Sequence, residues 1–236
     1  MDIEREIRGN RRSGKLTISL LRQLELFRDI AKADLEALAR ASRWHLYRRH
    51  EEIVGPGEEG QPFFVIAAGL VGITAVSPRG KEFIGLLLHA DDLFSFVDLP
   101  PALSESTHAQ AMSGPTIIYR LHEKQFKAVK RTSPAVRRLV EEQTNRHLHA
   151  VSEVLLDFVF YDAQTRFTRI LGRLAARNED HMVWFTHDEL GHLTGLNRAK
   201  VTTFLGQLRD RGLVSYGSHQ HGVKIPDPSR LWSKGD

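Results

Sequence analysis

The side chains best suited to recognising another molecule gather in one stretch, residues 185–214, which reads FTHDELGHLTGLNRAKVTTFLGQLRDRGLV. Its second half places Arg198, Lys200, Thr202 and Thr203 among apolar residues. A guanidinium carries two parallel N–H donors, which match the paired acceptors of a guanine edge or of a phosphate. Threonine hydroxyls add a donor and an acceptor. These groups offer binding chemistry.

A capping box begins the first helix that must position them. The hydroxyl of Thr186 can accept from the amide of Glu189, while the Glu189 carboxylate reaches back to the start of the helix. Leu190 and Leu193 form its buried face. Gly195 ends it, because a residue without Cβ adopts the left-handed backbone without strain.

Asn197 caps a second helix, whose inward positions follow the spacing i, i+3, i+4 and i+7. These positions are Val201, Phe204, Leu205 and Leu208. The stretch GLVSYGSHQHGVKI that follows predicts two short strands around a turn. The pattern favours a winged helix-turn-helix, in which the second helix enters a major groove. An ordinary helical hairpin that only packs a core is the alternative.

Charge and composition point the same way. The 11 Lys and Arg of residues 163–236, against 7 Asp and Glu, account for the whole net charge of +4, which suits a polyanion partner. With no cysteine, the chain has no disulfide, thiolate zinc site, cysteine-ligated cluster or thiol nucleophile. It contains no Walker, nucleophile-elbow, HExxH or dinucleotide motif, so we predict no enzymatic activity.

The rest of the chain divides by pattern. We predict a charged tail at 1–15, a sensor β-domain at 16–133 with a helical lead-in, a long helix at 134–161 and the winged domain at 162–236. Short apolar segments between turn signals from Trp44 to Leu121 are typical of a β-sandwich or barrel. No apolar run is long enough to span a membrane and no signal peptide is recognisable, so we expect a cytoplasmic protein.

The long helix, from about Pro134 to Phe160, would measure roughly 40 Å at 1.5 Å per residue. Its apolar seam predicts pairing with an identical helix, and the alternative is packing on its own β-domain only. The predicted dimer residues are Val136, Leu139, Val140, Val151, Val154, Leu155 and Phe158.

The motifs resemble those of the cyclic-AMP receptor and fumarate-nitrate regulator (CRP/FNR) family of bacterial transcription factors. EEIVGPGEEGQPFFVIAAGLVGI is similar to the entry of that family's sensor barrel, YDAQTRFTRILGRLA to the segment after its dimer helix, and the opening stretch to its DNA-binding motif. The resemblance implies an α+β chain with an N-terminal jelly-roll β-barrel, a dimerisation helix and a C-terminal winged helix-turn-helix. It also implies a homodimer on a pseudo-palindromic double-stranded DNA site, with RNA polymerase as a partner.

The resemblance also assigns roles to residues. It places Arg198, Thr202 and Thr203 at base-reading positions, and Ala199 where many relatives have Glu, so that a methyl could meet thymine but nothing accepts from cytosine. Thr186 and Asp188 fall at phosphate-contact positions. The remaining predicted phosphate contacts are Asn197, Lys200, His219 and Lys224.

In the sensor domain, members that bind a cyclic nucleotide use a Gly-Glu pair and an Arg-Ser pair. Alignment puts Ser95-Phe96 and Ser106-Thr107 at those places, and carboxylates nearby would repel a phosphate, so we predict no response to cyclic nucleotides. We expect no cofactor. His89 and His108 are the weak candidates for an axial haem ligand. The alternative function is a ligand-sensing, haem-sensing or protein-contact module in which the DNA domain is degenerate or secondary.

Overall fold

The structure is a computed structural model that describes residues 12–57, 62–96, 100–216 and 222–232. The chain divides into two compact units, Met1–Val151 and Ser152–Asp236. In the described residues, no helix combines the length and the apolar character needed to cross a bilayer.

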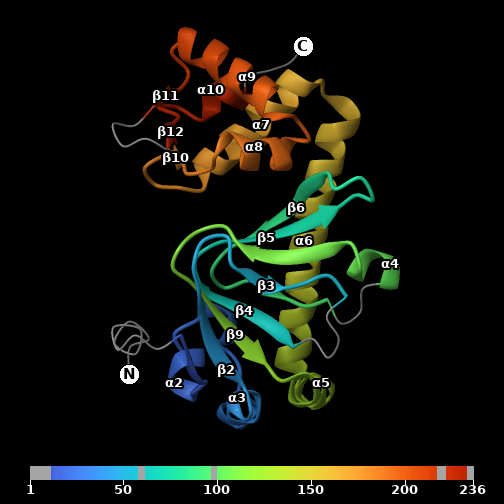
Figure 1. Cartoon of the computed structure of the whole chain (residues 1–236). Coiled ribbons are helices and arrows are strands. Elements are labelled where there is room, and N and C mark those ends of the chain that lie inside the picture. The colour runs from blue at the N-terminus through green and yellow to red at the C-terminus, as the bar shows by residue number, and fades with distance from the viewer. Residues whose placement is uncertain (1–11, 58–61, 97–99, 217–221, 233–236) are drawn as a thin grey trace. The chain divides into compact units, whose positions relative to one another are not determined.

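The first unit is built mainly from two antiparallel sheets (Figure 1). One sheet has the order β1-β2-β9-β4-β7, and the other has the order β3-β8-β5-β6. The strand bounds are β1 Ser13–Lys15, β2 Arg43–Tyr47, β3 Glu52–Val54, β4 Phe63–Ala68, β5 Val71–Val76, β6 Glu82–Leu88, β7 Leu93–Phe94, β8 Thr107–Ala111 and β9 Thr116–Leu121. The predicted β-domain is confirmed as a jelly-roll-like pair of sheets, which do not close into one barrel.

Side chains point alternately to the two faces of the five-stranded sheet, and this produces two hydrophobic cores. On β9, Ile117 and Tyr119 face the helices that cover the five-stranded sheet, whereas Ile118 faces the second sheet. On β2, Trp44 lies in the helix-covered core while Tyr47 packs toward the other. Because side chains on a strand alternate between faces, each central strand of this sheet serves both cores.

Short helices cover one face of the five-stranded sheet. They are α2 Ile18–Leu21, the 3₁₀ helix η1 Glu25–Phe27, α3 Lys32–Ala39 and α5 Glu123–Thr132, and a further short helix, α4 Pro101–Ser104, precedes β8. Figure 1 shows α2, α3 and α5 gathered at one end of the sheets. The helical lead-in is therefore present, although it is broken into three pieces.

The expected tail is partly a strand. Ser13–Lys15 form β1 and pair with β2, with Gly14 opposite Trp44. A Cβ at Gly14 would lie 2.5 Å from the indole nitrogen of Trp44, so the glycine lets the backbone rest on the ring. The charged pattern alone did not reveal this packing, and residues 1–11 lie outside the described part of the chain.

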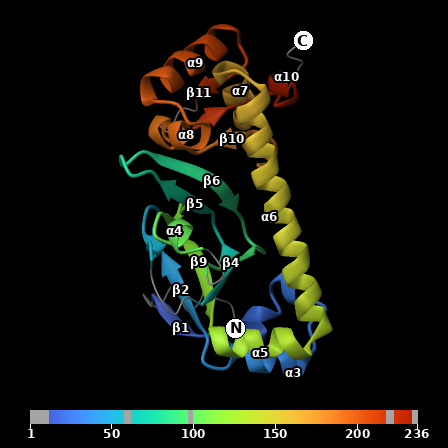
Figure 2. The same cartoon turned by 90° about the vertical axis from the view of Figure 1, so that its right-hand side faces the viewer.

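The predicted long helix is confirmed as α6, Pro134–Phe160, an uninterrupted helix in Figure 2. Its first turns differ from our expectation of a dimer seam. Val136 is 1% exposed and Leu139 is 6% exposed, and both lie in the core of the first unit. Val140 packs partly against the same core. These three side chains already pack within their own chain. They therefore do not form the N-terminal part of the dimer seam that the sequence predicted.

The second unit is a small helical domain with a three-stranded sheet of order β10-β12-β11. Its elements are α7 Ala163–Ala176, β10 Met182–Val183, α8 His187–Thr194, α9 Arg198–Asp210, β11 Ser215–Tyr216, β12 Val223–Lys224 and α10 Ser229–Trp232. The ring centroids of Phe167 on α7 and Phe204 on α9 are 5.7 Å apart. Both predicted helices and the predicted wing strands are confirmed.

Candidate nucleic-acid interface

The first helix of the motif begins as the sequence predicts. The amide of Glu189 donates to the Thr186 hydroxyl at 3.1 Å, and the Thr186 amide donates to the Glu189 carboxylate at 2.6 Å. Both halves of the capping box are therefore formed. The Glu189 carboxylate is engaged in this cap, whereas the hydroxyl of Thr186 can still donate its hydrogen to an outside acceptor.

Two glycines shape the turn between α8 and α9. Gly195 has φ of 71°, the left-handed conformation that only glycine adopts at no steric cost. The amide of Leu196 donates to the carbonyl of Gly191 at 3.0 Å. A Cβ at Gly191 would lie 2.7 Å from the carbonyl oxygen of Leu196, so a side chain there would push the turn away from α8. The angle between the two helices depends on both positions.

Asn197 then caps α9 by accepting from the amide of Lys200 at 2.9 Å. Val201, Leu205 and Leu208 are buried and hold the helix against its own unit. This leaves the opposite face of the first two turns in solvent. That face carries Arg198, Ala199, Lys200, Thr202 and Thr203, all exposed. The positive end of the helix dipole lies at the same turn and favours an anion.

The hydroxyl hydrogens of Thr202 and Thr203 are already donated within α9. The hydroxyl of Thr202 donates to the carbonyl of Arg198 at 2.9 Å, and that of Thr203 donates to the carbonyl of Ala199 at 3.0 Å. Each side chain therefore offers its methyl group and an acceptor lone pair to solvent. Together with the methyl of Ala199, this makes an apolar surface that suits the C5 methyl of thymine.

His187 connects the two helices at this face. Its Nδ1 lies 2.8 Å from the Thr202 hydroxyl oxygen. Because the single hydroxyl hydrogen of Thr202 points to the Arg198 carbonyl, Nδ1 must carry the hydrogen in this contact. Burial and the nearby Arg198 lower the pKa of His187, and Asp188 opposes them. The sequence offered no signal for this contact, which depends on how α8 and α9 cross.

Asp188 contacts Arg198, which is the principal candidate for reading a base. Its Oδ2 accepts from Nη1 of Arg198 at 2.9 Å. Their side chains are 54% and 70% exposed, so the pair orients the guanidinium more than it stabilises the fold. A carboxylate engaged in this way repels a phosphate. The geometry thus favours an orienting role for Asp188 over the phosphate contact that the resemblance implies.

The other predicted phosphate contacts are placed as follows. Thr186 and Lys200 are exposed at the N-terminal ends of α8 and α9. Lys224 is exposed on β12, which pairs with β11 to form the wing. His219 lies outside the described residues. The structure brings the first two to neighbouring helix ends and puts Lys224 on a separate element.

A second candidate surface runs along α6. Its exposed apolar residues are Leu148, Val151, Leu155, Leu156, Phe158, Val159 and Phe160. Leu148, Val151, Leu155 and Val159 recur at steps of three and four residues, which is the seam of a paired helix. They lie on the face opposite Leu139 and Asp157, which are buried.

The sequence reasoning missed two members of this seam. Heptad counting from Leu155 would have found Leu148 and Val159. Val154 is half-buried. Phe158 is partly engaged within its own unit, because the guanidinium of Arg166 lies 4.2 Å above its ring.

The positions aligned with a cyclic-nucleotide pocket hold no cation. Phe96 is 6% exposed and packs in the core between the sheets. The Ser106 hydroxyl donates to the carbonyl of Ala102 at 2.8 Å, and Thr107 is buried on β8. The Ser106 hydroxyl is engaged with α4, and the Phe96 ring is apolar. Neither can neutralise a cyclic phosphate, so these residues do not fit that ligand.

The two haem-ligand candidates are not brought together as a pair. His89 follows β6 and its amide donates to Oδ2 of Asp92 at 2.7 Å, whereas His108 lies on β8 opposite Thr74. Strand β5 lies between β6 and β8 in the sheet. Among the described residues, no group of three or more His, Asp or Glu side chains is arranged to hold a metal ion.

A winged helix-turn-helix with an exposed polar recognition face, following a jelly-roll-like domain and a long helix, defines the class of DNA-binding transcription regulators with a sensor domain. Residues 165–233 match the Crp-like helix-turn-helix domain family. The cAMP-activated global transcriptional regulator CRP of Salmonella typhimurium is 24% identical over 187 residues, covering 77% of this chain and 87% of the relative. The cyclic AMP receptor protein of Thermus thermophilus is 25% identical over 192 residues, covering 81% and 88%.

Solved structures share the fold. A CRP/FNR-family regulator from Eubacterium rectale superposes with a TM-score of 0.70 at 15% identity, covering 89% of this chain and 96% of the other. FixK2 from Bradyrhizobium japonicum gives 0.68 at 20% identity, covering 80% and 94%. In sequence and in fold, the chain is therefore similar to transcription regulators of the CRP/FNR family.

Proposed function

We propose that this regulator acts as a homodimer that reads a two-fold-related DNA site through α9, without a cyclic nucleotide. The observation that carries the proposal is the exposed face of α9, where Arg198 is held by Asp188 and Thr202 by His187. A recognition helix whose first turns are fixed by the preceding helix needs little reordering when it enters a major groove.

The chemistry of this face indicates the kind of site. The Arg198 guanidinium suits O6 and N7 of a guanine. The methyl groups of Ala199, Thr202 and Thr203 suit thymine, and no side chain here takes the place of the glutamate that accepts from cytosine in many relatives. We therefore infer a half-site with one guanine beside one or more thymines, distinct from the commonest family sequence.

Dimerisation supplies the second half-site. The exposed stripe Leu148, Val151, Leu155 and Val159 supports pairing between copies of α6, because an apolar seam of this length is costly in water. A two-fold dimer presents two recognition helices to successive turns of the major groove. RNA polymerase is the further partner that the resemblance to the CRP/FNR family favours.

Independence from cyclic nucleotides follows from the sensor domain. Phe96, Ser106 and Thr107 stand where relatives that bind such ligands carry the groups for ribose and phosphate, and none of the three carries a charge. The curated relatives in Salmonella and Thermus are named for cyclic AMP, so this chain differs from them in its proposed effector.

Selection from a pool of random double-stranded DNA tests the proposed function. We expect enrichment of a palindromic sequence with a guanine at one symmetric position in each half-site, using protein purified without added ligand. Failure to enrich any sequence, while the protein remains folded by circular dichroism, would favour the alternative in which the DNA domain is degenerate and the sensor acts by contact.

A further inference from the structure

His187 is a titratable side chain at the face that we propose for DNA, and the resemblance to the CRP/FNR family assigned it no role. It is the first residue of α8 and directly follows Thr186, the cap of that helix. In helix-turn-helix proteins the first helix crosses the DNA backbone while the second enters the major groove. If the chain binds DNA as proposed, the ring of His187 therefore lies where a backbone phosphate passes.

Two hydrogen bonds determine the tautomer of the neutral His187 ring. The Thr202 hydroxyl donates its single hydrogen to the carbonyl of Arg198 at 2.9 Å, so its contact of 2.8 Å with Nδ1 of His187 needs a hydrogen from the imidazole. A neutral imidazole carries one N–H, so Nε2 is then an acceptor. Since Nδ1 and Nε2 lie on different edges of the ring, Nε2 points away from Thr202.

An acceptor nitrogen is unfavourable beside a phosphate oxygen. Both atoms present lone pairs, and neither supplies a hydrogen. Protonation of His187 removes this conflict and keeps the contact with Thr202, because an imidazolium donates from Nδ1 and from Nε2. A hydrogen bond from this cation to a phosphate would be charge-assisted, and such bonds are stronger than those between neutral groups.

The free protein favours the neutral His187 ring. Burial lowers the pKa of His187 most, Arg198 on α9 lowers it further, and Asp188 on α8 acts in the opposite direction. Among the described residues, Arg198 and Asp188 are the charged groups that act on this ring. The positive end of the α8 dipole also disfavours a cation at the first residue of the helix. A phosphate beside the ring would oppose these effects and raise the pKa.

We propose that His187 takes up a proton when the protein binds DNA and donates from Nε2 to a backbone phosphate, so that DNA binding is tighter at lower pH. The inference rests on the proposed function, because it needs α8 beside the DNA backbone. A group whose pKa is higher in the complex than in the free protein contributes fully to binding below the free pKa. The contribution is lost as pH rises through the pKa of the complex.

The affinity of the full chain for DNA, measured as a function of pH, tests the inference. Between about pH 8 and about pH 6, we expect the Kd for a selected sequence to fall about tenfold per half-site, the gain of one charge-assisted contact. Scrambled DNA should gain by the same factor, because a phosphate carries no sequence information. The dependence of log affinity on log salt should be steeper at the lower pH by roughly one unit per half-site.

Two substitutions separate the charge of His187 from its hydrogen bond to Thr202. His187→Asn keeps an amide that can donate to Thr202 but cannot titrate, so its affinity should change little with pH. His187→Arg is charged at every pH, so it should bind at about pH 8 as the wild type binds at about pH 6. Circular dichroism at each pH verifies that the variants are folded. A pH response in His187→Asn equal to that of the wild type would overturn the proposal.

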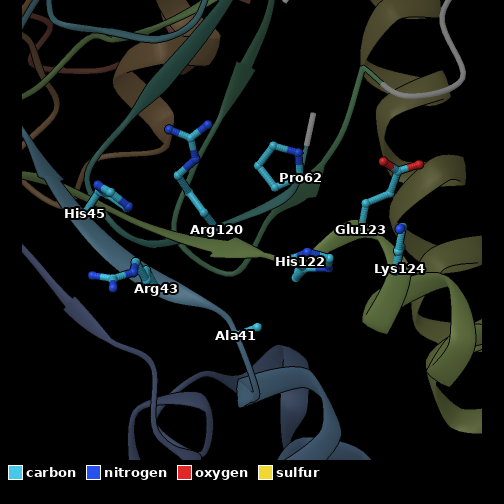
Figure 3. A pocket seen from close by; sticks show the side chains of 8 residues that line it. All are labelled: Ala41, Arg43, His45, Pro62, Arg120, His122, Glu123 and Lys124. Carbon is cyan, nitrogen blue, oxygen red and sulfur yellow. The ribbon is translucent and has the colours of Figure 1, made fainter. Parts of the chain in front are cut away.

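His45 provides a matched control in the first unit. It is half-buried on β2, and burial lowers the pKa of its ring, with Arg120 and Arg43 acting in the same direction. Figure 3 shows His45 with these two arginines. His45→Asn should keep the wild-type dependence of DNA affinity on pH. A response that is lost in His45→Asn and kept in His187→Asn would place the proton in the first unit and contradict the proposal.

The same measurements distinguish a failure of this inference from a failure of the proposed function. Selective binding at about pH 8 without a response to pH would refute proton uptake by His187 and leave base reading by α9 in place. Absence of DNA binding at both pH values would refute both. A gain at lower pH that is confined to the selected sequence would overturn the phosphate contact, because the proton would then serve a base.

Discussion

Single side chains determine what the recognition face offers to DNA. Arg198 is held by Asp188, and the Thr202 hydroxyl is engaged by two hydrogen bonds, one to the carbonyl of Arg198 and one with Nδ1 of His187. Lys224 on the wing carries a compact ammonium on a flexible four-carbon stem. We therefore expect base reading and charge attraction to be carried by different residues, which experiments can separate.

Loss of Arg198 should change specificity. We expect Arg198→Ala to cost about 1 to 3 kcal/mol per half-site and to relax the preference at one symmetric position, because the guanine contact is lost. The measurement is competition between selected and scrambled DNA. Arg209→Ala is the matched control, because Arg209 is exposed in the last turn of the same helix. An unchanged ratio of specific to scrambled binding in Arg198→Ala contradicts the proposed reading.

Loss of Lys224 should act differently. As a phosphate contact, it adds affinity to every sequence, so Lys224→Ala should weaken selected and scrambled DNA alike. The dependence of log affinity on log salt should become shallower by roughly one unit per site neutralised. A change in sequence preference without a change in salt dependence would exclude the phosphate role.

His187 should make stability depend on pH. Its pKa lies below the ordinary 6.5 because of burial and Arg198. The folded state therefore favours the neutral ring, so this contribution is complete above the unfolded pKa and is lost as pH falls through the folded one. Between about pH 7.5 and about pH 5, we expect the melting temperature to fall less in His187→Asn, whose amide can still donate to Thr202.

The control for this experiment is His149→Asn, which changes an exposed histidine on α6. It should follow the wild-type slope. If His187→Asn follows it as well, His187 is not a source of the pH dependence.

At the scale of elements, much was predictable because local signals agree. The capping box, the left-handed Gly195 and the Asn197 cap predicted α8 and α9, and the structure confirms each. The contacts of His187 and Asp188 across the motif were not predictable, since they depend on the crossing of the helices. Val136 was assigned to the wrong partner because periodicity identifies an apolar face without saying what covers it.

The apolar stripe of α6 predicts the oligomeric state. Charges at Val151 and Leu155 should produce monomers that have lost specific DNA affinity, because both side chains are exposed within one chain and would be buried by pairing. Glu153→Lys is the control, since residue 153 lies about 200° around the helix from Leu155. Sedimentation at micromolar concentration is the measurement, and a monomeric wild type contradicts the dimer.

The junction of α6 and α7 depends on one buried carboxylate. Asp157 is 1% exposed and accepts from Nε of Arg169 at 2.9 Å and from Arg173. Removing one partner of a buried pair costs about 3 to 5 kcal/mol, so Asp157→Ala should lower the free energy of unfolding by this amount. Asp162→Ala, which removes the exposed cap of α7, should cost clearly less. Chemical denaturation measures both, and equal losses would contradict the role of the buried clamp.

At the scale of the whole molecule, the proposed independence from cyclic nucleotides would distinguish this chain from the relatives that are named for cyclic AMP. Millimolar cyclic AMP or cyclic GMP should neither raise the melting temperature nor change DNA affinity, because no cation stands at the aligned phosphate position. A saturating rise of several degrees would show that another residue supplies the charge. The sequence alone could predict this absence of a cation.

The contacts of Asp157 have a consequence for the DNA site that we propose. It ties the last turns of α6, which carry Leu155 and Val159 of the proposed seam, to α7, and the ring of Phe167 on α7 packs on α9. In the proposed dimer, the seam would define the two-fold axis, and this chain of contacts would set the distance and the angle of each α9 from that axis. We therefore expect the number of base pairs between the two half-sites of the proposed operator to depend on a carboxylate and two arginines that lie outside the proposed DNA-contact residues.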